Sequence, residues 1–129
     1  MASIFTKIIN GEIPSYKVAE NEDFYAFLDI NPNAAGHTLV VPKREVNRIF
    51  DLKEETYLGL MKFSREIAVA MKEVLPCDRI GMAVIGLEVP HVHVHLIPLN
   101  AMEDIQFQKK VKLTSEEFQS IASAIATNL

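Results

Sequence analysis

The stretch His91-Val92-His93-Val94-His95-Leu96-Ile97 places three of the four histidines of the chain at alternating positions in an apolar run. Side chains of an extended strand alternate between two faces, so the three imidazoles share one face and the aliphatic residues pack on the other. Imidazoles have an ordinary pKa of about 6.5 and like charges repel, so at least some members of the row stay neutral near neutral pH. Neutral imidazoles can act as a nucleophile, a base or a metal ligand.

Two chemistries are open to this histidine row. In the first, one ring donates its Nδ1 proton to a carbonyl, which leaves Nε2 as a nucleophile toward a phosphoryl or acyl centre. In the second, the three rings bind zinc and leave one position for water. The apolar opposite face predicts a central strand in either case. The fourth histidine, His37, follows Gly36 at the start of another predicted strand and is less distinctive.

The composition limits the class of protein. A chain of 129 residues with 49% apolar residues fits one globular domain spanning residues 1–129. A net charge of −4 without any block of Lys or Arg argues against binding to extended nucleic acid. The single cysteine, Cys77, cannot form an intrachain disulfide, and no segment is typical of a signal peptide or a membrane span. We therefore expect a cytoplasmic protein.

The hydrophobic pattern around the row predicts an α+β fold. Strands come first, followed by a long amphipathic helix, two more strands and a second amphipathic helix. The early strands are joined too closely for crossover helices, so we expect one antiparallel sheet. The predicted elements are helical turns at 3–10, strands at 16–19, 24–28, 37–41, 78–85 and 91–98, and helices beginning near Asp51 and Thr114.

Capping patterns and periodicity define the two long helices. Asp51 with Glu54, and Thr114 with Glu117, have the spacing of a capping box. Each helix should turn one apolar stripe toward the sheet. The expected stripes are Leu58, Met61, Ala68, Met71 and Leu75 in the first helix and Phe118, Ile121, Ala122 and Ile125 in the second.

Residues 91–97 match, at every position, the His-φ-His-φ-His-φ-φ signature of the histidine-triad (HIT) nucleotide-binding superfamily, in which φ is apolar. Two other blocks resemble the same family. They are IFTKIINGEIP at 4–14, and AFLDINP at 26–32 followed by GHTLVVPK at 36–43. The resemblance covers residues 4–98 and is greatest to the purine nucleoside phosphoramidase (Hint-like) branch, whereas residues 99–129 form a less distinctive C-terminal extension.

This resemblance implies a HIT-like fold, with a five-stranded antiparallel sheet, one long helix and a C-terminal helix, assembled as a homodimer with joined sheets. It implies a hydrolase or transferase acting on the α-phosphate of purine nucleoside phosphoramidates through a nucleotidylated histidine, with AMP as the nucleotide unit and no cofactor. Two alternatives are a dinucleoside polyphosphate hydrolase and a non-catalytic nucleotide-binding or signalling module.

The resemblance also implies roles for the four histidines. His93, the middle residue of the row, would be the nucleophile that becomes nucleotidylated. His91 and His95 would hold its tautomer and the phosphate oxygens, and His37 would lie near the leaving group. Attack through a histidine divides one slow displacement into two in-line steps and requires no metal.

The remaining site residues follow from the same resemblance. Asp29 would accept hydrogen bonds from the ribose hydroxyls, and an apolar slot formed by Phe5, Ile8 and Ile30 would hold the base. This chain has Leu87 and Glu88, in a predicted tight connection before the row, where relatives often have Gln followed by Ser or Thr. Because a carboxylate repels phosphate, we hypothesise that Glu88 faces a leaving amine instead.

Overall fold

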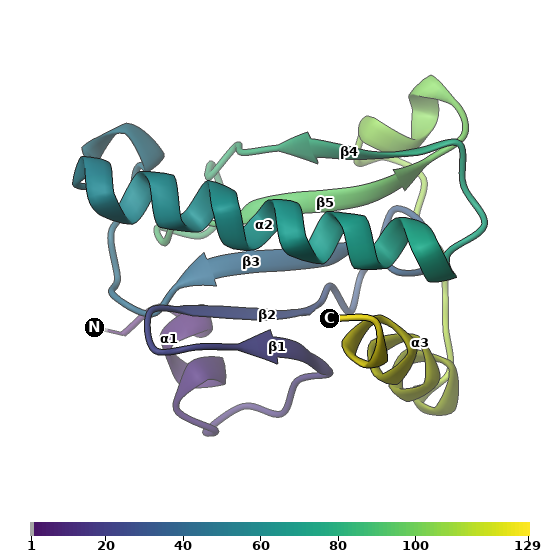
Figure 1. Ribbon diagram of the computed structural model, residues 1–129, viewed down its shortest axis with the longest axis horizontal. Coiled ribbons are helices and arrows are strands. Elements are labelled where there is room, and N and C mark those ends of the chain that lie inside the picture. The colour runs from purple at the N-terminus through teal and green to yellow at the C-terminus, as the bar shows by residue number, and fades with distance from the viewer. Residues whose placement is uncertain (1) are drawn as a thin grey trace.

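The computed structural model describes residues 2–129. Its five strands form one antiparallel sheet in the order β1-β2-β3-β5-β4 (Figure 1). The α+β class and the antiparallel sheet are confirmed. β5 is interior, as its apolar face predicted, since it lies between β3 and β4. The strands are β1 Lys17–Glu20, β2 Phe24–Leu28, β3 Thr38–Pro42, β4 Arg79–Ala83 and β5 Val94–Leu99.

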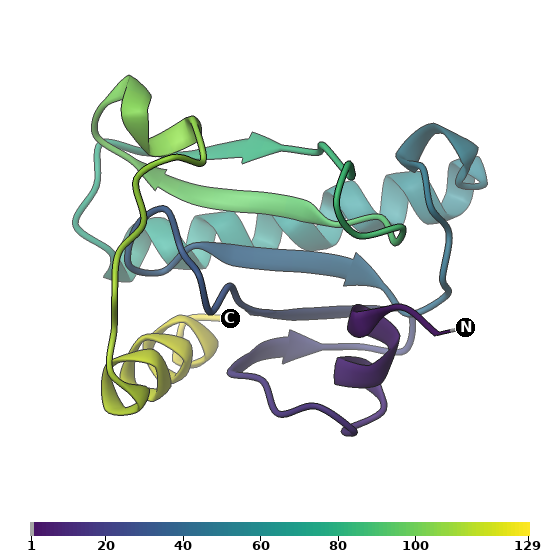
Figure 2. The ribbon, with the colours of Figure 1, turned by 180° about the vertical axis from the view of Figure 1, so that it is seen from behind.

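Helices cover the two faces of the sheet unequally. The long helix α2 and the C-terminal helix α3 lie on one face (Figure 1), and the short α1 lies on the opposite face (Figure 2). Within residues 2–129, no helix is both long enough and apolar enough to cross a membrane. The helices are α1 Ile4–Ile9, α2 Glu54–Val74 and α3 Ser115–Thr127, with short 3-10 turns η1 Ile49–Asp51 and η2 Met102–Ile105.

The main core lies between the sheet and helices α2 and α3. Val92, Val94 and Leu96, which alternate with the histidines, are buried in this core as predicted. Burying one such side chain stabilises the fold by about 1.5–3 kcal/mol. A slip of one residue would expose these three side chains and drive the imidazoles into the apolar core. The core therefore determines the direction in which the histidine row points.

The predicted capping box of the C-terminal helix is confirmed. The Thr114 hydroxyl accepts from the Glu117 N–H at 3.1 Å, and the Glu117 carboxylate accepts from the Thr114 N–H at 2.9 Å. Phe118, Ala122 and Ile125 are the buried residues of α3. The sequence predicted this helix correctly because both its cap and its apolar stripe are local features.

The start and the buried face of α2 differ from the prediction. Asp51 lies in the turn η1, and α2 begins after Lys53 without a side-chain cap, so the predicted capping box at Asp51 is wrong. Leu58 is 56% exposed and does not face the core. Two apolar stripes overlap along this helix, and only contact with the sheet selects one of them. The selected face consists of Leu60, Ser64, Ile67, Ala70 and Met71.

The connection between the last two strands is also longer than predicted. It runs through residues 84–93, so the strand bounds at 78–85 and 91–98 and the tight turn between them are wrong. Pro90 has no N–H for a strand ladder, and Gly86 has a φ of +75°. The Val92 N–H donates instead to the Val46 carbonyl at 2.8 Å. The first two histidines of the row therefore precede the strand.

Candidate active site

All four histidines are buried in one cluster, and the end formed by His91 and His93 lies against the short helix α1. The Phe5 ring of α1 meets the rings of His91 and His93 edge-on, with centroids 5.8 and 4.9 Å away. The rings of His93 and His95 lie 4.9 Å apart, and those of His95 and His37 lie 5.2 Å apart. The row is thus a continuous cluster of imidazoles, and His37 joins it from the start of β3.

His93 is held with one nitrogen free. Its Nδ1 lies 2.8 Å from the backbone oxygen of His91. Because a carbonyl can only accept, Nδ1 carries the proton and Nε2 keeps its lone pair. The ring lines a cavity, and residues 2–129 provide no hydrogen-bond partner for Nε2. A lone pair directed at a ligand cavity is the geometry of a nucleophile or a base.

His91 uses both ring nitrogens within the protein. Nε2 lies 2.7 Å from the Pro42 carbonyl, so it carries the proton and donates it. Nδ1 is then an acceptor, and the Ser3 hydroxyl donates to it at 2.7 Å. These two bonds fix the His91 residue whose backbone oxygen orients His93.

Ser3 is itself held by the cap of α1. Its hydroxyl oxygen accepts from the Thr6 N–H at 3.1 Å, the bond of a helix N-cap. The Glu45 carboxylate accepts from the Ser3 N–H and from the Thr6 hydroxyl, each at 2.7 Å. These bonds, the Ser3 N–H first, lower the pKa of Glu45. An ionised carboxylate and a helix cap therefore position His91 indirectly.

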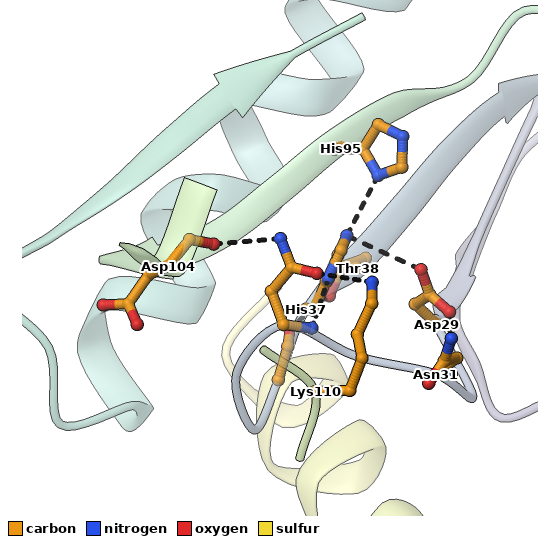
Figure 3. Close-up of polar contacts among 9 residues, drawn as sticks. Asp29, Asn31, His37, Thr38, His95, Asp104 and Lys110 are labelled. Carbon is orange, nitrogen blue, oxygen red and sulfur yellow. Dashed lines mark hydrogen bonds and ion pairs between the residues drawn. The ribbon is translucent and has the colours of Figure 1, made fainter. Parts of the chain in front are cut away.

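His37 and His95 form a second chain of hydrogen bonds (Figure 3). The Asn33 N–H donates to His37 Nδ1 at 3.0 Å, so the His37 proton is on Nε2. That Nε2–H donates to His95 Nδ1, also at 3.0 Å. His95 consequently carries its proton on Nε2 and can offer it to a ligand in the cavity.

Burial keeps these rings uncharged. It lowers the pKa of His37 to about 3 and that of His95 to about 4, with further lowering from neighbouring histidines and Lys110. Burial is also the main cause that lowers the pKa of His91. Because a buried charge without a partner is costly, the three rings are neutral at pH 7, as their hydrogen bonds require.

Asp29 lies beside the second chain (Figure 3). Its Oδ1 accepts from the Asn31 N–H at 2.8 Å, and its Oδ2 lies 3.7 Å from His37 Nε2. Burial raises the pKa of this carboxyl group, although the Asn31 bond opposes the rise. The partly buried side chain borders the cavity and has acceptor positions left for a ligand.

A cavity of about 530 Å³ joins the predicted residues of the site, a size typical of small-molecule sites. Its lining includes Phe5, Asp29, Glu88, His93 and His95. His91 and His37 act on it through the two chains of hydrogen bonds. Two residues predicted for the base slot lie apart from it. Ile8 is buried in the small cluster beneath α1, and Ile30 is 73% exposed and borders a separate hollow.

The ligand atoms of Asp29, His37 and His95 lie within 4.8 Å of one another, which raises the metal interpretation again. A metal ion on His37 Nε2 would require the proton on Nδ1, where it would oppose the Asn33 N–H. In the row, both nitrogens of His91 are already bonded. The hydrogen bonds therefore favour the nucleophile over the metal site.

Several residues of the site escaped the sequence-based prediction. Ser3 is a good N-cap by residue type, which was a usable signal, but nothing in the sequence connected it to His91. Asn33 and Glu45 are loop residues; Glu45 accepts from Ser3, 42 residues away, whereas Asn33 donates to His37 only four residues further on. Phe107 and Lys110 line the cavity from the C-terminal extension, with the Phe107 ring 4.8 Å from that of His95. No local pattern marks them.

Comparison with known proteins agrees with this geometry. The model of the HIT domain family matches residues 10–102. The chain belongs to the HIT family, as its histidine row indicated.

Three similar proteins illustrate this relationship. An uncharacterized HIT-like protein of Borreliella burgdorferi is 35% identical, over 98% of this chain and 97% of its own. The adenosine 5'-monophosphoramidase HNT1 of Saccharomyces cerevisiae is 42% identical, over 75% of this chain and 62% of its own. The crystal structure of a HIT-like protein involved in cell-cycle regulation from Bartonella henselae has a TM-score of 0.87 and 34% identity, and covers 98% of this chain and 96% of that one.

Proposed function

We propose that this protein is a nucleotide-binding hydrolase that cleaves purine nucleoside phosphoramidates, or related nucleotide conjugates, at the α-phosphate through a nucleotidylated His93. The observation that carries the proposal is the state of His93, whose Nδ1 proton is bound by a carbonyl while Nε2 borders the cavity. The similarity to a yeast adenosine 5'-monophosphoramidase supports the substrate class.

The reaction proceeds in two displacements at phosphorus. In the first, His93 Nε2 gives its electron pair to the α-phosphorus, the bond from phosphorus to the leaving nitrogen breaks, and the departing amine takes up a proton. In the second, water attacks the same phosphorus, the bond to His93 breaks, and the nucleotide leaves. The water supplies one oxygen to the phosphate and a proton that balances the one taken by the amine.

The other residues bind the substrate and stabilise the charge that develops. The Nε2–H of His95 donates a hydrogen bond to a phosphoryl oxygen, and the ring needs no net charge to do so. Asp29 accepts from the ribose hydroxyls, and Phe5, which lines the cavity, packs against the base. Each of these groups is already directed by the fold, so little reorganisation is needed at the moment of reaction.

Glu88 is the residue proposed to select the leaving group. It is exposed and borders the cavity on the connection before the row. At this rim the ionised Glu88 side chain accepts hydrogen bonds from a leaving amine and attracts a cationic one, and its carboxylic acid form can give the amine a proton. We therefore assign it to the leaving side rather than to the phosphate.

We also propose that the protein is a homodimer. Leu58 and Val69 on α2 and Met82 on the edge strand β4 are large apolar side chains left exposed. An open edge strand beside exposed apolar residues is suited to pairing with a second copy. Size-exclusion chromatography with light scattering should give twice the chain mass, and Leu58→Glu should reduce it to one.

The experiment that tests the function is the capture of the covalent intermediate. Protein treated with a chelator is mixed with an adenosine phosphoramidate, quenched early with denaturant and examined by intact mass. We expect one added nucleotide on the wild-type protein and none on His93→Ala. Tight binding without adduct or turnover would contradict the proposal in favour of a binding module. Activity that depends on added zinc would contradict it in favour of a metal site.

A further inference from the structure

The cavity carries more negative than positive charge before a substrate enters. Asp29 and Glu88 both line it, and burial keeps His37 and His95 neutral. Among the described residues of the lining, Lys110 is the one with a cationic side chain. A nucleotide brings further negative charge at its phosphate, which two carboxylates repel. Some group must therefore compensate this charge.

Lys110 is held in place on the side of His37 (Figure 3). Its Nζ donates to Oδ1 of Asn33 at 2.7 Å. Asn33 is buried, and its own side-chain N–H donates to the Asp104 carbonyl at 2.9 Å. An ammonium group has three protons, so two remain for a ligand. The charge is thus oriented by the fold without being neutralised by a carboxylate.

The backbone around Phe107 brings Lys110 to this place. Phe107 has a φ of +60°, in the left-handed region that residues other than glycine rarely adopt. Its ring packs edge-on against His95 with centroids 4.8 Å apart, and Lys110 Nζ lies 5.1 Å from the centre of the same ring. Such backbone conformations persist where the surrounding structure enforces them, often at functional sites.

We propose that Lys110 binds the α-phosphate of the substrate, so that residues 102–111 form one wall of the active site. The inference rests on the proposed function, because it takes a nucleotide as the ligand. The Lys110 ammonium donates to non-bridging phosphoryl oxygens and stabilises the charge on them as His93 attacks. His95 supplies a neutral donor to the same group, and Lys110 supplies the full positive charge.

The test compares a ligand that has the phosphate with one that lacks it. The affinities of AMP and adenosine are measured by calorimetry, at low salt, for the wild type, Lys110→Met and Lys110→Arg. We expect Lys110→Met to weaken AMP binding by about tenfold or more and to change adenosine binding by less than about twofold. Lys110→Arg, which keeps the charge, should recover most of the AMP affinity.

Lys109→Met is the matched control. Lys109 is the neighbouring cation on the same segment, but it is exposed and pairs with Glu103 at 3.3 Å. Its substitution should leave both affinities unchanged. A similar loss of AMP binding in Lys109→Met would overturn the proposal, because it would indicate general electrostatic attraction instead of a specific contact.

Other results would also overturn it. Unchanged AMP affinity in Lys110→Met contradicts the phosphate contact, and equal weakening of AMP and adenosine shows that Lys110 only supports Asn33 and the fold. If the methionine variant unfolds, Lys110→Gln, which keeps a donor for Asn33, gives the same comparison. A wild-type protein that binds neither ligand contradicts the proposed function and this inference with it. If the wild type binds AMP but Lys110→Met shows no loss specific to the phosphate, only the role of Lys110 is contradicted.

Discussion

The histidine cluster has a chain of hydrogen bonds at each end, and the two chains leave opposite groups facing the cavity, a lone pair at one end and an N–H at the other. At one end, Ser3 and the Pro42 carbonyl fix His91, whose backbone oxygen holds the Nδ1 proton of His93. At the other end, the Asn33 N–H fixes His37, which donates to Nδ1 of His95. His93 therefore offers a lone pair at Nε2, and His95 offers a proton at the same atom.

The two ends differ because different groups begin the two chains of hydrogen bonds, although the rings themselves are all imidazoles. A carbonyl or a hydroxyl at one position, and an amide N–H at another, decide which nitrogen of each ring carries the proton. Alternation along the chain places the rings together but leaves their tautomers open. The partners of the rings thus leave a lone pair on His93 and an N–H on His95, and the bond from His37 to His95 joins segments distant in sequence.

The largest expected effect distinguishes the two ends directly. His93→Ala should lower kcat for an adenosine phosphoramidate by about 10⁴-fold or more, because it removes the proposed nucleophile. His95→Gln should cost only about tenfold, since a glutamine amide can still donate at this position, and His95→Leu should cost more than His95→Gln. Steady-state kinetics measure all three. Equal losses in His93→Ala and His95→Gln would contradict the assigned roles.

Acid should destabilise the His37 and His95 end. In the unfolded chain these imidazoles gain protons near pH 6.5, whereas the folded protein excludes them until about pH 4 for His95 and about pH 3 for His37. The unfolded state therefore binds more protons between these values, and stability falls as pH drops from 6.5 toward 4. Asp29 opposes this loss, because its raised pKa lets the folded protein take up a proton more readily than the unfolded chain does as the pH falls.

The expected loss of unfolding free energy is on the order of a few kcal/mol, measured by denaturant titration at pH 7 and pH 4.5. His37→Gln should show a smaller loss over the same interval, because it removes the group with the most strongly lowered pKa. A pH dependence that His37→Gln leaves unchanged would place the acid sensitivity elsewhere in the molecule.

Ser3→Ala tests the His93 end through its positioning residue. Loss of the hydroxyl frees His91 Nδ1, and we expect kcat to fall by about tenfold with little change in KM. The lost cap should also cost about 1 kcal/mol of stability, measured by urea denaturation. Ser3→Thr should rescue both, and Thr6→Val, which keeps the Ser3 hydroxyl, should change kcat less. A rise in KM at constant kcat would mean that Ser3 acts on binding instead.

The smallest expected effect concerns the leaving group. Glu88→Ser should slow hydrolysis of lysine-type phosphoramidates by about three- to tenfold while sparing substrates with a neutral leaving group, because Glu88 lies in an exposed and screened position. Competition between the two substrate types gives the ratio of kcat/KM values directly. An equal effect on both types would remove Glu88 from the leaving side.

Local patterns predicted the parts of the fold that depend on nearest neighbours. The capping box at Thr114 and the alternation of Val92, Val94 and Leu96 with the histidines are confirmed. The prediction failed at α2, where Leu58 belongs to a second apolar stripe that turns outward. It also failed before β5, where the strand begins only at Val94. Both errors concern a choice between local alternatives that only packing resolves.

The sequence by itself determined that three imidazoles share a face, since alternation in an extended chain is a local property, and it indicated the family. Only the tertiary structure decided which nitrogen of each ring carries the proton. On His93 the proton position depends on the backbone oxygen of His91, and on His95 it depends on the bond from His37, whose own tautomer is set by the Asn33 N–H. Tertiary structure likewise brought Lys110 to the cavity, because the fold of the C-terminal segment, and no motif within it, sets that position.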